Sequence, residues 1–106
     1  MPEEALVVLV TFPDVETARR IVTTLVEERL AACGNLLPNV ESIYRWQGAV
    51  ETASEVLVLL KTEIRSYSAL ETRLQELHPY EVPECLAVNV ATGSLPYLRW
   101  LNESVN

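Results

Sequence analysis

The chain has 106 residues, which is enough for one domain with a single hydrophobic core and too few for two. Hydrophobic residues make up 49% of it and only 3 residues are glycine, as in a packed globular protein rather than a disordered one. The formal net charge of −7 and the absence of a basic cluster argue against nucleic acid as a partner.

The apolar runs bear on membranes and on cellular location. The longest, 5–10 and 56–60, fall far short of the roughly 20 residues that span a bilayer, so we expect no membrane partner. The start, MPEEALVV, has no basic segment before its apolar run, which predicts a cytoplasmic protein. Cys33 and Cys85 show no CxxC or Cys/His ligand spacing, so we expect two buried thiols and no structural zinc site.

The first third of the chain predicts a buried strand followed by an amphipathic helix. Residues 5–12 (ALVVLVTF) form a continuous apolar run that ends at Pro13, as in a central strand. Asp14 then offers a side-chain cap for a helix. Apolar residues recur at helical spacing, and we expect the helix to end at Gly34 and Asn35.

The middle of the chain predicts a long hairpin. Residues 36–46 are expected to form a second strand, with Tyr44 and Trp46 on one face by the two-residue period. Gln47-Gly48 is a candidate tight turn, and a third strand is expected over about 50–62. Both strands are about twice the mean strand length.

The last part of the chain predicts a helix, a strand and a short helix. Ser68 and Glu71 have the spacing of a capping box, so a second helix is expected from Ser68 to His78, where the following proline stops it. Residues 84–92 alternate like a fourth strand. A short final helix is expected after Gly93-Ser94.

This order predicts an α+β fold, a ferredoxin-like split βαβ sandwich over residues 1–106 as a single domain. It has a four-stranded antiparallel sheet, two helices on one face, a long hairpin between the second and third strands and a short C-terminal helix. The other face would be apolar and uncovered. We therefore expect a homo-oligomer, with Tyr44 and Trp46 at the interface between subunits.

Several stretches together resemble the CutA family of divalent-cation-tolerance proteins. They cover nearly the whole chain in the family's order: VTFPDVETA (10–18), RLAAC (29–33), SIYRWQG (42–48), Glu55 with LLKT (59–62), HPYEVPE (78–84) and YLRWL (97–101). The resemblance implies a homotrimer of ferredoxin-like subunits, similar in architecture to PII signalling proteins. It also implies a role in tolerance of copper and other divalent metals, while animal members are linked to membrane anchoring of acetylcholinesterase.

The stretch HPYEVPE holds the only histidine of the chain and has two interpretations. In one, His78 binds a divalent ion such as copper or zinc together with Cys33, Glu81 or Glu84, and no cofactor is otherwise required. Relatives described as copper binders have a cysteine in place of Val10 and a histidine in place of Leu77, so of those three ligands only His78 is present. In the other interpretation, His78 hydrogen-bonds at a helix end and the two prolines stiffen the turn.

An alternative function is a PII-like signalling or scaffolding module that binds a small anionic ligand or a protein partner between subunits. The candidate pocket residues for the anion are Trp46, Lys61, His78, Tyr80 and Trp100. Lys61 is more simply interpreted as an ion-pair partner of Glu55. No phosphate-binding loop and no thiol activated by neighbouring cations is evident, so we predict that the protein is not an enzyme.

Overall fold

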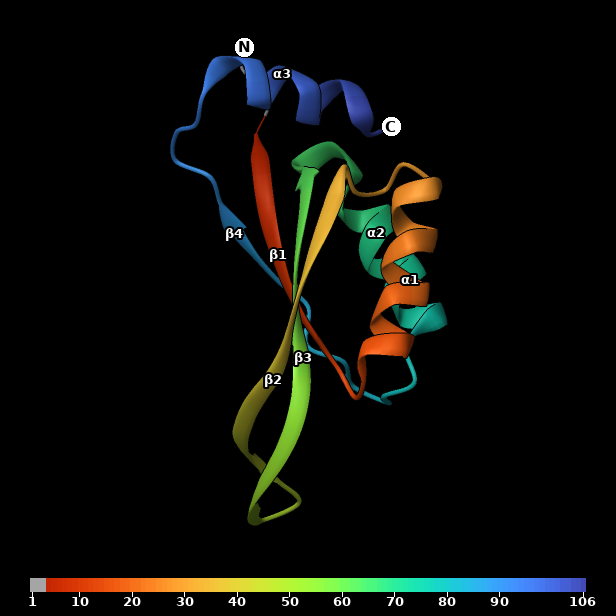
Figure 1. Ribbon diagram of the computed structural model, residues 1–106, viewed down its shortest axis with the longest axis vertical. Coiled ribbons are helices and arrows are strands. Elements are labelled where there is room, and N and C mark those ends of the chain that lie inside the picture. Colours follow the sequence, from red (N-terminus) through yellow and green to blue (C-terminus); the bar gives the residue numbers. More distant parts are fainter. Residues whose placement is uncertain (1–3) are drawn as a thin grey trace.

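The computed structural model describes residues 4–106, which form one antiparallel sheet packed against helices (Figure 1). In chain order the elements are β1 (Ala5–Phe12), α1 (Val15–Glu27), β2 (Cys33–Trp46), β3 (Ala49–Glu63), α2 (Ile64–Leu77), β4 (Leu86–Asn89) and α3 (Leu95–Ser104). The strand order is β2-β3-β1-β4. The predicted ferredoxin-like split βαβ sandwich is therefore confirmed.

The core lies between the sheet and the helices α1 and α2. Alternate side chains of β1 and β3 point toward the helices and are fully buried there: Leu6, Val8, Val10, Phe12, Val56, Val58 and Leu60. Burying each such side chain stabilises the fold by roughly 1.5–3 kcal/mol. The two central strands therefore hold the helices in place.

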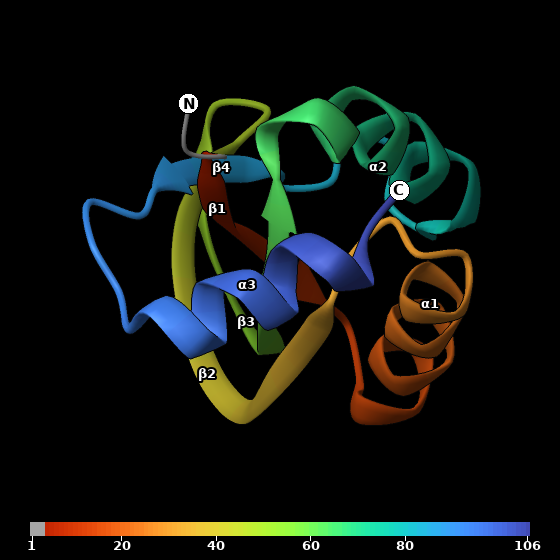
Figure 2. The same ribbon diagram turned by 90° about the horizontal axis from the view of Figure 1, so that it is seen from above.

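The opposite side of the sheet, which we call the open face, remains largely uncovered. Helix α3 lies across one end of the sheet, where Leu101 and Val105 pack on Ala5 and Ala32 (Figure 2). Beyond that end, the open face carries a row of half-buried or exposed apolar side chains: Val7, Leu9, Leu37, Leu57, Leu59, Leu86 and Val88. The structure thus confirms that two helices cover one side of the sheet only.

The hairpin of β2 and β3 extends well beyond the rest of the domain (Figure 1). Its strands are 14 and 15 residues long. Gln47 and Gly48 both have positive φ angles, 51° and 83°, as a two-residue hairpin turn requires. A β-bulge between Leu37 and Val40 shifts the register by one residue, so that Tyr44 and Trp46 lie on the same face as Glu55.

Helix α1 ends at Glu27 and not at Gly34, so the predicted end was wrong. Arg29 has a φ of 61°, and the amide of Leu30 donates to the Leu25 carbonyl while that of Arg29 donates to Val26. This pair of bonds is a Schellman motif, which closes a helix at a residue in the left-handed region. Gly34 and Asn35 belong to β2 instead.

Helix α2 begins at Ile64 and not at Ser68, so the predicted capping box was also wrong. The Ile64 amide donates to the Glu4 carbonyl at 2.9 Å, and this tertiary contact replaces a local side-chain cap. Strand β4 covers 86–89 instead of 84–92, because it pairs with β1 only over 6–9. Within residues 4–106 none of the helices is both long and apolar enough to cross a membrane.

Gly34 allows α1 to approach β2 closely. A Cβ atom at this position would lie 2.5 Å from Val22 Cγ1 and 3.0 Å from Leu60 Cδ2. We predict that Gly34→Ala lowers the free energy of unfolding by about 1–3 kcal/mol, the usual cost of overpacking a core, measured by denaturant unfolding. Gly93→Ala is the control, because its nearest neighbours are the flexible end of Leu98. Equal stability of the Gly34 variant and the wild type would contradict this account of the packing.

Candidate functional site

A cleft of about 480 Å³ opens between the β2–β3 hairpin and the segment that joins α2 to β4. Three aromatic rings and three carboxylates line it. We call it the acidic cleft and define it by Thr11, Tyr44, Trp46, Glu55, Pro79, Tyr80, Glu81, Val82 and Glu84. Its volume is within the range of about 300–1,000 Å³ found for small-molecule sites.

The floor of the acidic cleft is fixed by a hydrogen bond between Tyr80 and Glu55. The Tyr80 hydroxyl donates to Glu55 Oε2 at 2.6 Å, and Glu55 is only 9% exposed. Burial and this carboxylate raise the pKa of Tyr80, so the hydroxyl stays protonated and acts as the donor. The bond ties the α2–β4 segment to β3, across 25 residues of sequence.

His78 holds the α2–β4 segment in place and is almost fully buried, with 7% of its surface exposed. Its Nδ1 accepts the Tyr80 amide at 3.0 Å, so Nε2 must carry the proton and donate to the Thr11 carbonyl at 2.8 Å. The ring stacks on Phe12 with centroids 4.6 Å apart. Burial lowers the pKa of His78, which keeps the imidazole neutral. The geometry is that of a histidine that fixes a stiff turn after a helix.

The four residues predicted to bind a metal ion do not come together in one subunit. Cys33 lies at the start of β2, beside Lys61, whereas His78 lies beside Thr11, which pairs with Leu57. Glu81 and Glu84 line the acidic cleft. Across residues 4–106, no group of three or more His, Cys, Asp and Glu side chains is placed to hold a metal ion. With both ring nitrogens in hydrogen bonds, His78 has no lone pair available unless the Tyr80 contact opens.

The two cysteines are free, half-buried thiols in different places. Cys33 Sγ lies 3.7 Å from the Tyr97 hydroxyl, and Cys85 Sγ lies 3.5 Å from the Tyr67 hydroxyl. Burial raises the pKa of the Cys85 thiol, which disfavours the reactive thiolate.

The residues predicted to bind an anion are split between two ends of the molecule. Trp46 and Tyr80 line the acidic cleft. Lys61 instead hydrogen-bonds Asn35, and Trp100 packs on Tyr97 of α3, with ring centroids 5.3 Å apart. The alternative that Lys61 pairs with Glu55 was wrong, because the two lie on the same strand roughly 20 Å apart.

The electrostatic character of the acidic cleft is negative. Its lining, among the described residues, includes Glu55, Glu81 and Glu84 and no Lys, Arg or His. Although Glu84 is exposed overall, the protein atoms around its carboxyl group and the charge of Glu55 raise its pKa. Three like charges without a protein cation favour a positively charged occupant.

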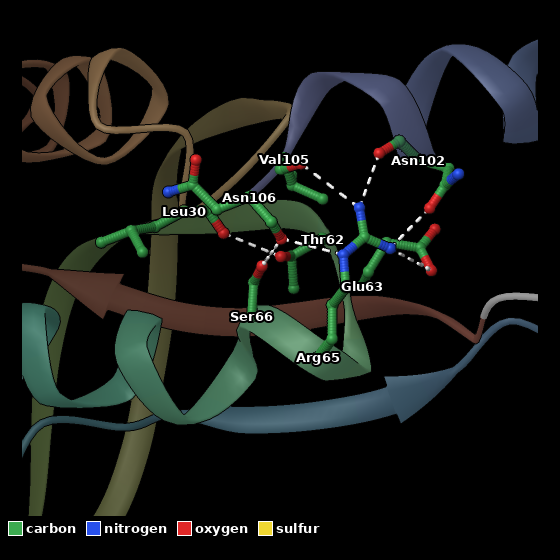
Figure 3. Close-up of polar contacts among 8 residues, drawn as sticks. All are labelled: Leu30, Thr62, Glu63, Arg65, Ser66, Asn102, Val105 and Asn106. Atoms are coloured by element: carbon green, nitrogen blue, oxygen red, sulfur yellow. Dashed lines mark hydrogen bonds and ion pairs between the residues drawn. The ribbon is translucent and has the colours of Figure 1, made fainter.

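A second polar cluster, which no sequence motif indicated, holds the C-terminal residues (Figure 3). The Arg65 guanidinium donates to Asn102 and to the Asn106 carbonyl, the latter at 2.9 Å, and Ser66 Oγ donates to that carbonyl at 2.6 Å. Glu63, which is 1% exposed, lies 3.8 Å from Arg65. Since the hydrogen bonds of Arg65 and Ser66 join the start of α2 to Asn102 of α3 and to Asn106 beyond it, we interpret the cluster as structural.

The fold and the cleft together define a ferredoxin-like subunit with an extended hairpin and an acidic, aromatic pocket at its base. The family model described as "CutA1 divalent ion tolerance protein" matches residues 6–104. The chain therefore belongs to the CutA1 family.

Similar proteins and solved structures support this family assignment. The chain is 51% identical over 98 residues to the divalent-cation tolerance protein CutA of Thermus thermophilus, covering 92% of this chain and 95% of the relative. It is 42% identical to the human protein CutA, covering 97% of this chain and 58% of the human one. The solved CutA1 structure from Oryza sativa has a TM-score of 0.95 at 38% identity, covering 99% of this chain and 96% of that one.

The buried neutral His78 predicts a pH dependence of stability. The unfolded chain binds a proton at His78 near pH 6.5, whereas the folded chain does so only at lower pH. The unfolded state therefore binds more protons, and the free energy of unfolding should fall as the pH is lowered from about 7 to 5. His78→Gln keeps a side-chain amide able to donate to Thr11 and removes the titration. Thermal unfolding of both proteins across this range should show a flatter profile for the variant, and parallel profiles would contradict the assignment.

Proposed function

We propose that this protein is a non-enzymatic homotrimer that binds divalent metal ions such as copper weakly and contributes to tolerance of these ions. The observation that carries the proposal is the family match over residues 6–104, together with relatives named divalent-cation tolerance proteins. The raised pKa of the Cys85 thiol gives no support to a thiol-based reaction. A cytoplasmic location stays a prediction.

The open face supports assembly into an oligomer. Its apolar row runs across the four strands, and Leu86, Val88 and Leu37 at its edges are exposed in the isolated subunit. Large exposed apolar patches on a soluble chain mark interaction surfaces. The overhanging hairpin adds Tyr44 and Trp46, also exposed, at the predicted interface. A closed trimer would cover these surfaces.

The acidic cleft supports weak binding of divalent ions. Glu81 and Glu84 supply oxygen ligands, and the first lies in a turn while the second precedes β4. Among residues 4–106 of one chain no three ligands are gathered at one point, which is consistent with low affinity. The anion-binding alternative is not supported, because Lys61 lies outside the cleft and the lining is acidic.

We predict that a charge on the open face dissociates the trimer without unfolding the subunit. Leu86 is 59% exposed, so Leu86→Glu should leave the subunit folded while burying a carboxylate in any interface that covers this face. Light scattering should give three chain masses for the wild type and one for the variant. Ile64→Glu, which adds the same charge at an exposed position at the start of α2, should remain trimeric. A monomeric wild type would refute the assembly.

We predict that Glu84 contributes to metal binding. Calorimetric titration with Cu²⁺ and Zn²⁺ should show weak, saturable binding, and Glu84→Gln should weaken it about tenfold, or about 1.4 kcal/mol. Glu16→Gln on the exposed face of α1 is the matched control and should change nothing. The tolerance role is checked by growth on copper of bacteria that lack their own homologue, with and without the protein. Absence of saturable metal binding, or of any growth difference, would count against the proposal.

A further inference from the structure

We propose that α3 is a strap that detaches from the sheet while the core stays folded, and that the hydrogen bonds of Arg65 hold it in place. This motion is independent of metal tolerance. The contacts that govern it lie within one chain, between α3 and the sheet and between the end of α3 and the helices α1 and α2.

Helix α3 packs on a hydrophobic cluster of its own. Leu101 and Val105 are only 2% and 4% exposed, and they pack on Ala5 and Ala32. None of these four residues belongs to the larger cluster that lies between the sheet and the helices α1 and α2. Segments with few buried apolar contacts open more readily than the core of a protein. Detachment of α3 would therefore leave the larger cluster intact.

Arg65 of α2 caps the C-terminal end of α3 (Figure 3). Its guanidinium donates to the carbonyls of Asn102, Val105 and Asn106, at 2.7, 3.2 and 2.9 Å. The last carbonyls of a helix have no partner within the helix, and a cation beside them offsets the partial negative charge of the helix end. Ser66 donates to the Asn106 carbonyl as well, at 2.6 Å. Two neighbouring side chains of α2 thus hold the end of α3.

The turn that ends α1 holds the same end of α3. Arg29 Nη2 donates to the Glu103 carbonyl at 2.7 Å. In the opposite direction, the backbone amide of Asn106 donates to the Arg29 carbonyl and its side-chain amide donates to the Glu28 carbonyl, both at 3.0 Å. The other end of α3 is capped locally, by its own Ser94. The strap is therefore held at its C-terminal end and can pivot on the segment that joins it to β4.

Detachment of α3 would enlarge the apolar surface of the sheet. Ala5 lies on the same face of β1 as Val7 and Leu9, because side chains two residues apart in a strand share a face. Helix α3 covers Ala5 and leaves the rest of this row uncovered. The contacts of Arg65 thus control how far the apolar row of the open face extends.

The experiment is amide hydrogen exchange of the intact protein without denaturant, with light scattering under the same conditions to give its assembly. After correction for intrinsic rates, we expect the amides of residues 98–105 to exchange at least a hundredfold faster than those of 6–10 in β1 and 56–60 in β3. Exchange of the three segments at one rate would overturn the inference. Protection of α3 by a neighbouring subunit, to the level of the strands, would overturn it too.

A pair of substitutions in α2 tests the role of Arg65. Arg65→Gln removes the guanidinium and should speed exchange in α3 about tenfold or more, with the strands unchanged. Arg73→Gln is the matched control, since both arginines lie on α2 with 36% and 34% of the side chain exposed. Arg73 instead pairs with the carboxylates of Glu28 and Glu76, so its loss should not affect α3. Equal effects of the two substitutions, or no effect of Arg65→Gln, would refute the role of Arg65.

A third substitution tests whether the strap is separate from the core. Leu101→Ala removes a large part of the apolar contact of α3 and should speed exchange in α3 alone, by tenfold or more. If α3 is lost altogether, circular dichroism should show less helix while the strand amides stay protected, which would support the inference. Equal acceleration in β1 and β3 would mean that strap and core unfold as one unit, against the inference.

The outcomes are separate from those of the proposed function. None of these measurements uses a metal ion, so a strap that does not detach would leave the tolerance role standing. Absence of metal binding would, in the same way, leave the motion of α3 as measured.

Discussion

The antiparallel pairing of β1 with β3 is the contact on which the rest of the structure depends. These strands lie at the centre of the sheet and are apolar on both sides. One side is sealed by α1 and α2, and the other is met only at its end by α3. Since apolar area exposed to water costs about 25 cal/mol per Å², the same pair of strands that builds the domain also presents the surface on which the proposed assembly rests. Folding and the proposed assembly would in this sense both be consequences of one strand pairing.

The acidic cleft depends on contacts between segments far apart in the chain. His78 joins α2 to the Thr11 carbonyl at the end of β1, and Tyr80 reaches Glu55 on β3. The histidine thus acts on the site through the backbone of its neighbour and has no free nitrogen of its own to offer. In the sequence alone His78 resembles a metal ligand. In the structure its imidazole instead fixes the position of Tyr80, which lines the acidic cleft.

The elements with strong local patterns could be predicted from the sequence, and those set by tertiary contacts could not. The run at 5–12, the Asp14 cap, the hairpin turn and the overall topology followed from apolar period and turn chemistry. The end of α1 escaped prediction because its Schellman motif uses Arg29 rather than glycine, and the start of α2 because its first amide pairs with Glu4. Within one chain Trp46 and Tyr80 line the same cleft, whereas Lys61 and Trp100 lie outside it, because strand register places Lys61 and α3 carries Trp100. The predicted pocket between subunits stays a prediction.

The bulge at residues 38–39 adds one residue to β2 that has no partner on β3. Upstream of it the odd-numbered residues of β2 share the face of Lys61, and downstream the even-numbered ones do. If one of the two bulge residues were lost, the other would pair with Val56, while Val40 would still pair with Glu55 and Tyr44 with Glu51. Tyr44 and Trp46 would therefore keep their face, whereas the positive φ that Asn39 adopts would no longer be needed. The bulge is thus a position at which the hairpin could change its length in evolution without moving its aromatic side chains.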